Sequence, residues 1–435
     1  MNYPNFNLIF FNRSHYYILF HYFCTKLIVM KYLLIFFTLC FAFHANAQQI
    51  LKVNVKNPLK TERADQPVVI SLEKYGEVRS ALVKCGEEEI PCQLDDIDLD
   101  EQYDELCFLV DLKGKEQKTY TVTLYSDGEP RTYPARVYAE MLMRNDKVKE
   151  KNKHNNFVSS LTVRGDCANS YNLLHHHGVD FESELNGIRI YFDKRQTLDL
   201  YGKFQKRLEL QATQFYTQED QKKAGYGDDV LWVGNTFGLG AFRGWDGKEP
   251  TMIDPVKNRT QRVISYGPLR TIVEVIDQGW KAEANKPAIN MTIRYTQYAG
   301  HRDTDVDVYF NRQVSDYRFS TGIINVKGSE EFSDKKGLRA CWGTDYPSTD
   351  TVKWSRETVG LAILIPQKHI VSEEIANKDN YAFVVKTDDN HLSYKIAYCS
   401  DNETFGFHSE KKWFGWIKEW RKEVEKPIIL SSVQP

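Results

Sequence analysis

The stretch Arg302-Asp-Thr-Asp-Val-Asp-Val-Tyr-Phe310 alternates between polar and apolar side chains over its whole length. Successive side chains of a strand point to opposite faces. The pattern therefore predicts a half-buried strand, with Thr304, Val306, Val308 and Phe310 facing inward and Asp303, Asp305, Asp307 and Tyr309 facing outward. The ranges 290–298 and 186–193 alternate in the same way. Long alternating strands favour antiparallel sheets that bury one face.

The rest of the chain supports the same fold class. Further strands are predicted at 67–72, 89–95, 106–111, 119–125, 270–276, 360–366 and 394–399. Amphipathic helices are expected only at 414–424 and 218–224. We therefore predict an all-β protein with a small N-terminal β-sandwich over residues 48–134 and a large antiparallel two-sheet super-sandwich over residues 157–435. The charged stretch Arg144–Asn156 is expected to be a linker or an exposed loop.

Residues 1–47 are expected to lie outside the fold. From Met30, a lysine, an apolar run to Phe43 and the small-x-small site Ala45-Asn-Ala47 follow the layout of a secretory signal peptide, with an upstream extension before it. The run is shorter than the roughly 20 apolar residues that span a bilayer. We predict cleavage near Ala47 and a periplasmic or secreted protein, free of the membrane after cleavage.

Charge and motifs exclude several function classes. Loss of residues 1–47 removes three basic side chains and no acids, which shifts the formal net charge from −2 to −5. Nucleic acid is not expected as a partner, because it needs a basic face. No Cys-x-x-Cys, Gly-x-Ser-x-Gly, His-Glu-x-x-His or phosphate-loop motif occurs. Cys85 and Cys92 flank a short turn and are the best candidates for a disulfide in an exported chain.

The stretch Tyr171-Asn-Leu-Leu-His-His-His-Gly-Val-Asp-Phe-Glu-Ser-Glu184 has the highest density of chemically versatile side chains. Histidine titrates near neutral pH, and its neutral ring is a common metal ligand. Glu182 and Glu184 lie on the same side if the segment is extended. His176 and His177 are the preferred functional residues, because they are nearest the glycine that can redirect the backbone.

Other candidates lie further along the chain. Tyr191 and Tyr201 are candidates for proton transfer. The glycine-rich loop 225–247 carries Arg243 and Trp245, which suit a uronic acid sugar, because arginine pairs with a carboxylate and tryptophan packs on a sugar ring. His301 directly precedes the alternating segment Arg302–Phe310 and is a further candidate.

Several of these motifs together resemble an uncharacterised domain family of exported proteins encoded in polysaccharide-utilisation loci. They are Asn57-Pro-Leu, Pro67-Val-Val-Ile, Ile90-Pro-Cys-Gln-Leu-Asp-Asp96, Asp104-Glu-Leu-Cys-Phe-Leu109, His176-His-Gly178, Phe181-Glu-Ser-Glu184, Arg189-Ile-Tyr-Phe-Asp193 and Asp199-Leu-Tyr-Gly202. The resemblance implies a galactose-mutarotase-like super-sandwich, uronic-acid oligosaccharides as substrates, and an elimination reaction by a lyase or dehydratase.

The leading hypothesis is β-elimination on a uronic-acid-containing oligosaccharide. This reaction needs a cation at the carboxylate, a base for the C5 proton and an acid for the leaving group. Arg189 or Arg243 is expected to supply the cation, unless a Ca²⁺ or Zn²⁺ ion near the histidines replaces it. His176 or His177 is expected to be the base, and Tyr191 or Tyr201 the acid.

Two alternatives remain open. A glycoside hydrolase would use Glu182 or Glu184 with Asp228 or Asp229 as its carboxylate pair. A non-catalytic glycan-binding protein would use the same aromatic and basic residues without an acid and a base. In each case an oligosaccharide or polysaccharide is the expected ligand. Glu182, Glu184, Arg189, Arg243, Trp245 and His301 are the expected substrate-binding residues.

Overall fold

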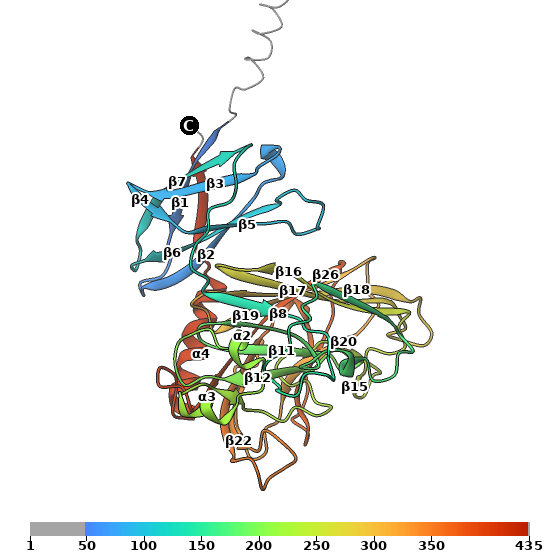
Figure 1. The fold of residues 1–435 in the computed structure, drawn as a ribbon. Helices are drawn as coiled ribbons and strands as arrows, with labels where there is room; N and C mark the ends of the chain where they lie inside the picture. Colours follow the sequence, from blue (N-terminus) through green and yellow to red (C-terminus); the bar gives the residue numbers. More distant parts are fainter. Residues whose placement is uncertain (1–47, 434–435) are drawn as a thin grey trace, which may run out of the picture.

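The computed structural model describes residues 48–433, so the predicted extension and signal peptide lie outside the described residues. The predicted fold class is confirmed: the described residues form antiparallel β-sheets and only short or peripheral helices. A small sandwich lies beside one end of a much larger one (Figure 1). Among the described residues, no helix has the length and apolar character needed to cross a membrane.

The small sandwich has two sheets. One has the order β27-β1-β7-β3-β4, and the other the order β2-β6-β5. Val55, Val83, Phe108 and Val122 are fully buried between them. The strand bounds are β1 Gln49–Lys56, β2 Arg63–Ser71, β3 Ser80–Cys85, β4 Glu88–Ile90, β5 Cys92–Asp95, β6 Glu105–Leu112, β7 Gln117–Tyr125 and β27 Ile429–Val433.

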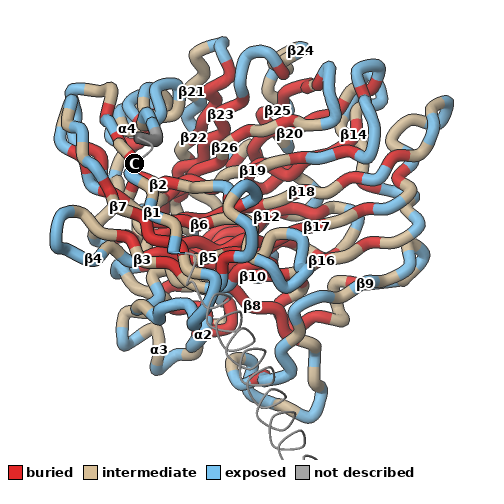
Figure 2. The backbone as a smooth tube through the Cα atoms, turned by 90° about the horizontal axis from the view of Figure 1, so that it is seen from above, coloured by how far each residue is buried: buried red, intermediate tan, exposed pale blue. Residues whose placement is uncertain are grey.

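One layer of the large sandwich is a nine-stranded antiparallel sheet. Its central strands β26, β19, β18 and β17 carry many buried residues, often in alternation with less buried ones (Figure 2). The predicted inward residues Val306, Val308 and Phe310 lie in the core, which confirms the alternation of β19. In sheet order the strands are β21 Glu330–Ser333, β22 Leu338–Asp345, β23 Glu357–Leu364, β26 His391–Ser400, β19 Asp303–Phe310, β18 Ile289–Tyr298, β17 Arg270–Trp280, β16 Asn258–Tyr266 and β9 Ser160–Arg164.

The second layer consists of two five-stranded sheets. Isolated bridges from Leu198 to Gly238 and from Leu239 to Ile323 connect the two sheets through the segment 238–239. Both sheets pack their apolar faces against the nine-stranded layer in one core. The first has the order β13 Asp228–Asp229, β12 Leu198–Gly202, β11 Gly187–Tyr191, β10 Gly178–Ser183 and β8 Val137–Glu140, and the second the order β15 Pro250–Thr251, β14 Arg243–Trp245, β20 Phe319–Ile324, β25 Asn380–Val385 and β24 Ile370–Glu373.

The helix expected at 414–424 is present and longer, as α4 (Glu410–Glu425). The Ser409 hydroxyl caps its first turn by accepting from the Lys412 amide. Trp413, Ile417 and Trp420 recur at helical spacing and pack on β22, β23 and β26. The helix expected at 218–224 is α3 (Glu219–Lys223), and a short α2 (Leu210–Thr213) precedes it.

The domain boundaries differ from those expected. Strand β27 pairs with β1, so residues 429–433 complete the small sandwich rather than the large one, as Figure 1 shows. Strand β8 begins at Val137 and pairs with β10. Because β8 already belongs to the large sandwich, the stretch Arg144–Asn156 is a loop within that unit and not an interdomain linker.

The predicted disulfide between Cys85 and Cys92 is wrong, since both thiols are free. Cys85 ends β3 in one sheet, whereas Cys92 begins β5 in the other. Pro91 lies between β4 and β5, and its missing N–H stops the hydrogen-bond ladder there, so the chain crosses to the opposite sheet.

Buried polar contacts join the two sandwiches. Gln93 of β5 accepts hydrogen bonds from the Leu269 and Arg270 amides, at 2.6 and 3.0 Å. The Arg270 guanidinium pairs with Asp95 at 2.7 Å, with both side chains almost fully buried. Such bonds have defined directions, so they fix the orientation of the small sandwich on the end of the large one.

Candidate functional site

The histidine run lies against the polar face of the sheet β13-β12-β11-β10-β8. On each strand, apolar side chains point into the core and alternate with polar ones on the opposite face. The core-facing set is Ala139, Val179, Phe181, Ile188, Ile190, Leu198 and Leu200. The opposite set is Tyr138, Glu140, Asp180, Glu182, Arg189, Tyr191, Asp199, Tyr201 and Asp229. Most of this polar face is buried, which is unusual because charged groups are costly to remove from water.

Four charged residues form one row across the sheet. Glu140, Asp180, Arg189 and Asp199 are successive cross-strand partners on β8, β10, β11 and β12. Side chains that are directly opposite on neighbouring strands lie within contact distance. The register therefore places three carboxylates and one guanidinium in a line, beneath the turn that carries the histidines.

Arg189 is the central cation of this face. Its Nη2 donates to Asp199 Oδ2 at 2.6 Å, to Asp229 Oδ2 at 3.2 Å and to the Tyr191 hydroxyl at 3.2 Å. Its guanidinium also stacks over the Phe215 ring at 4.3 Å. The Nη1 group is buried and has no hydrogen-bond partner among the described residues. Arg189 thus has one buried donor group that no other described residue satisfies.

Tyr191 and His177 stack beside this cation. Their ring centroids are 6.0 Å apart, and the ring planes differ by 11°. The Tyr191 hydroxyl donates to Asp199 Oδ2 at 3.1 Å, and burial raises its pKa, so the phenol keeps its proton. Burial and the positive charge of Arg189 lower the pKa of His177 to about 4, so its ring is neutral at neutral pH.

The backbone of His177 is strained. Its φ is +70°, in the left-handed region that non-glycine residues rarely adopt. Its Nδ1 lies 3.4 Å from the Tyr171 carbonyl oxygen. Because a carbonyl oxygen can only accept, this contact favours the tautomer with the ring proton on Nδ1 and the lone pair on Nε2. Such strain persists only where surrounding contacts impose it, and it is concentrated at functional sites.

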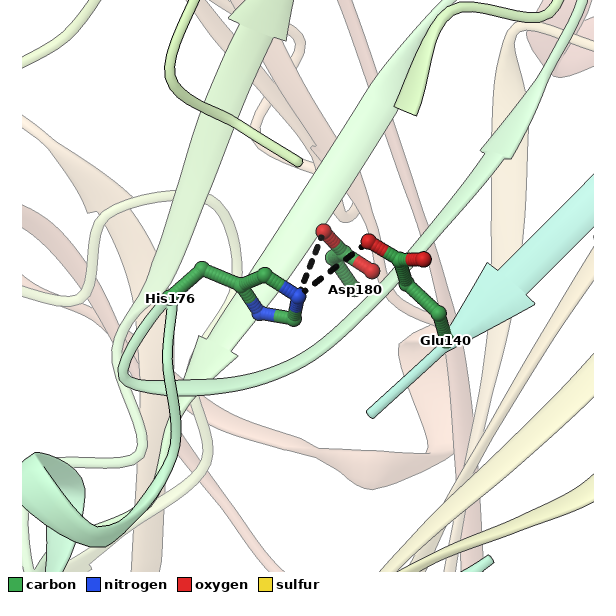
Figure 3. A group of neighbouring side chains, drawn as sticks. All are labelled: Glu140, His176 and Asp180. Carbon is green, nitrogen blue, oxygen red and sulfur yellow. Dashed lines mark ion pairs between the residues drawn. The ribbon is translucent and has the colours of Figure 1, made fainter. Parts of the chain in front are cut away.

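His176 points the other way, between two carboxylates (Figure 3). Its Nε2 lies 3.4 Å from Glu140 Oε1 and 3.4 Å from Asp180 Oδ2, and all three side chains are essentially fully buried. Burial and the charges of Glu140 and Glu182 raise the pKa of Asp180 well above its usual range. The three residues are one of two groups in the described chain whose ligand atoms are close enough to hold a metal ion.

The other such group is Asp96, Asp98 and Asp104, in a loop of the small sandwich. Asp96 and Asp104 accept hydrogen bonds from backbone amides of the same loop, including those of Ile97 and Leu99. These bonds explain the clustering as loop structure, without an ion.

The predicted candidates Glu182 and Tyr201 hold a covering segment in place. Glu182 is fully buried, pairs with Lys203 at 2.5 Å, and accepts from the Glu209 and Leu210 amides at the start of α2. The Tyr201 hydroxyl bonds Thr217, the Gly227 carbonyl and the Glu209 carboxylate, and its own pKa is raised by burial. Both side chains therefore anchor the segment 209–227 over the sheet.

Glu184 and His301 lie at the junction of the two sandwiches. Glu184 pairs with Arg136 at 2.5 Å, and Arg136 pairs in turn with Asp65 of β2. His301 bonds the Asp65 carbonyl through Nε2 at 2.8 Å and Asp303 through Nδ1 at 3.0 Å. His301 also lines a cleft of about 410 Å³ between β2, α4 and the nine-stranded sheet. The structure thus separates both residues from the Arg189–Tyr191–His177 group.

Arg243 and Trp245 do not join that group either. Arg243 is buried, and its guanidinium donates to the backbone carbonyls of Arg195, Asn235 and Thr236. Burial lowers its pKa to about 10. Trp245 lines a separate shallow pocket with Asp246 and Lys281. Their contacts indicate a structural role for Arg243 and a surface position for Trp245.

The carboxylates of the hydrolase hypothesis each have a different basic partner. Asp228 pairs with Lys222 at 2.8 Å, and Asp229 pairs with Arg189. Glu182 and Glu184 pair with Lys203 and Arg136, as described above. No single cation or cleft gathers them among the described residues.

Sequence reasoning missed Glu140 and Asp180 as site residues. Asp180 lies within the histidine stretch, two positions before Glu182. On an extended segment the two carboxylates therefore point to the same side, so the direction of Asp180 was predictable. Glu140 ends the alternating segment Val137-Tyr-Ala-Glu140, which is a recognisable strand with Tyr138 and Glu140 on one side. The pairing of that strand with β10 leaves no signal in the sequence, and this pairing brings the carboxylates together.

The comparisons with known proteins give a family and a distant structural likeness. Residues 55–429 match the model described as "Domain of unknown function (DUF4861)". No curated protein matches the sequence. Two solved structures from Enterococcus faecalis, a protein in glycosyl hydrolase family 38 and an alpha-mannosidase, align with 9% identity and a TM-score of 0.46. Each alignment covers 88% of this chain, which spans about half the length of those proteins, 47% and 46%.

Proposed function

Since the chain belongs to the DUF4861 family, whose description assigns no function, we propose a function from the site itself: β-elimination on a uronic-acid-containing oligosaccharide. The observation that carries the proposal is that Tyr191 contacts both Arg189, on the same strand, and His177, in the turn before β10. Arg189 supplies a cation, His177 a ring nitrogen with a free lone pair, and Tyr191 a phenol that holds its proton. These are the three functions that elimination beside a carboxylate requires.

Each group has a defined part in the reaction. The free Nη1 of Arg189 binds the uronate carboxylate and stabilises the negative charge that develops when C5 loses its proton. His177 Nε2 takes that proton. Tyr191 gives its proton to the oxygen that leaves C4, and Asp199, which accepts from the phenol, stabilises its orientation. The products are a C4–C5 double bond and either a released sugar or water.

Aromatic rings around the group suit a sugar ligand. Arg195 lies over the rings of Tyr171 and Tyr191, at 5.4 and 4.7 Å, and offers a second cation at the rim. The rings of Tyr171 and Tyr191 and the cation of Arg195 favour an anionic carbohydrate over a neutral apolar ligand. Export to the periplasm or beyond, where such polysaccharides are encountered, is part of the same proposal.

The test is an assay on a panel of uronate oligosaccharides, in which a new C4–C5 double bond is detected by its ultraviolet absorbance. The purified mature chain should produce that absorbance with at least one member. Tyr191→Phe and His177→Ala should each lower kcat/KM by about 100- to 10,000-fold, the usual contribution of one proton-transfer group.

The chain offers a matched control. Tyr309 and His391 form another stacked pair, at 4.7 Å, on the outer face of the nine-stranded sheet. Tyr309→Phe and His391→Gln change the same residue types away from the proposed site and should leave the rate unchanged. Sugar release without a double bond would instead identify a hydrolase, and tight binding without turnover a glycan-binding protein. Either result refutes elimination.

A further inference from the structure

We propose that Glu140, His176 and Asp180 bind one divalent transition-metal ion, with Zn²⁺ as the best fit. The proposal uses no step of the elimination reaction and holds or fails independently of it. It begins from the hydrogen bonds of the three side chains, which leave several buried acceptor atoms facing one another without a donor (Figure 3).

The His176 ring is fixed in one tautomer. Its Nδ1 lies 2.8 Å from the Gly178 carbonyl oxygen, which can only accept, so Nδ1 carries the proton. The lone pair of Nε2 is then directed toward the two carboxylates. Metal-binding histidines have this arrangement, in which one nitrogen donates to a carbonyl and the other binds the ion.

The acceptors that face Nε2 have no donors of their own. Glu140 Oε1 and both oxygens of Asp180 are buried and unpartnered within the described part of the chain. Buried acceptors in proteins are nearly always satisfied, so a cluster without a donor requires an explanation. A protonated His176 does not supply one, because 3.4 Å is too long for a charge-assisted N–H···O bond, which spans about 2.7–2.9 Å.

The distances match a tetrahedral ion. Zn²⁺ bonds to nitrogen and oxygen are about 2.1 Å long, so two ligand atoms at a tetrahedral angle are about 3.4 Å apart. That is the separation of His176 Nε2 from Glu140 Oε1 and from Asp180 Oδ2, and all the ligand atoms lie within 4.8 Å of one another. Calcium also tolerates such spacing, but it prefers oxygen ligands alone, whereas an imidazole ligand favours a transition metal.

Charge and outer contacts agree with this assignment. Two carboxylates neutralise one divalent ion, so the buried site has no net charge. The Tyr138 hydroxyl donates to Glu140 Oε2 at 2.6 Å and orients the carboxylate so that Oε1 faces His176. The ion would tie β8 and β10 to the turn before Gly178 and thereby hold the strained His177 next to Tyr191. We assign it a structural role, because His176, Glu140 and Asp180 are at most 1% exposed, which leaves a substrate no access to the ion.

The experiment measures metal content and stability without substrate. The untagged mature chain should hold about one equivalent of zinc per chain after zinc loading and desalting. Removal of zinc by a chelator should lower Tm, and zinc should restore it. Asp180→Asn keeps the shape of the side chain and should weaken zinc binding by more than about 100-fold. Tyr138→Phe, which changes only the outer contact, should weaken it by about 10- to 100-fold.

Two features make the outcome decisive. His175 is the matched control, because it adjoins His176 but stacks on His154 and is not among the proposed ligands, so His175→Ala should retain zinc. Without an ion, Asp180→Asn would relieve repulsion between carboxylates and raise Tm. The proposal is overturned if the wild-type chain takes up no zinc, if Asp180→Asn binds it equally well, or if that variant is the more stable protein in zinc.

Discussion

Replacement of Lys203 by methionine tests whether the polar face of the site sheet depends on a single buried cation. Lys203 is fully buried, and its Nζ donates to Glu182 at 2.5 Å, to the Ser183 carbonyl at 2.6 Å and to the Arg207 carbonyl at 2.7 Å. Methionine fills similar volume but removes all three bonds. Glu182 would then keep its backbone donors from α2 and lose its counter-charge.

The expected cost follows from these contacts. Removal of one partner of a buried ion pair typically destabilises a protein by about 3–5 kcal/mol, because the remaining charge is buried and uncompensated. Lys203→Met should therefore lower the free energy of unfolding by that amount. The double variant Lys203→Met/Glu182→Gln also removes the unpaired charge of Glu182, while the glutamine oxygen still accepts from the amides of α2. Its free energy of unfolding should be about 2 kcal/mol higher than that of Lys203→Met. The remaining loss comes mainly from the Ser183 and Arg207 carbonyls, which no longer have a donor.

The assay is urea denaturation at neutral pH, followed by tryptophan fluorescence and by circular dichroism. Coincident transitions justify a single free energy. A control is Lys335→Met, which removes an exposed lysine paired with Glu373 and should change stability by less than about 1 kcal/mol. The reasoning is refuted if Lys203→Met costs no more than this control, or if the double variant is no more stable than Lys203→Met.

Three further predictions concern other parts of the molecule. Burial lowers the pKa of His301, but Asp303 and the Asp65 carbonyl outweigh it and raise the pKa overall. The resulting stabilisation is complete below about pH 6.5 and is lost as pH rises through the folded-state pKa. His301→Gln should therefore cost more stability at about pH 6 than at about pH 9, and an equal cost at both would contradict the assignment. Arg243→Met leaves three backbone carbonyls without donors and should lower the free energy of unfolding by at least about 3 kcal/mol in denaturant titrations. Ile417→Val removes one buried methylene from the α4 interface and should cost about 0.5–1.5 kcal/mol, whereas no measurable loss would show that α4 is loosely docked.

The strands were predictable because the alternation of polar and apolar side chains along each strand shows which of its faces is buried. In β19, Val306 and Val308 face the core and the aspartates between them do not, and a period of two is visible without knowledge of any partner. In the structure, two of the outward carboxylates pair with bases. Asp305 pairs with Lys395 and Asp307 with His391, both from the neighbouring β26.

The site was only partly predictable, for a related reason. The importance of the histidine turn follows from local composition, but the partners of each histidine depend on which strands become neighbours. Glu140 lies 36 positions before His176 and contacts it only because β8 pairs with β10. Arg243 was misleading because sequence alone does not distinguish an arginine that faces a ligand from one that faces backbone carbonyls. The deciding quantity is burial, here 2% exposure.

The return of β27 to the small sandwich affects the order in which the protein can form. Strand β1 pairs with β7 on one side and with β27 on the other, so one edge of β1 has no partner until residue 429 has been synthesised. An unpaired strand edge can pair with other chains and promote aggregation. During synthesis, a nascent chain that already contains both complete layers of the large sandwich would still carry an open N-terminal sheet. A truncation before residue 429 should therefore yield a protein that self-associates through β1, even though every residue of the site sheet is present.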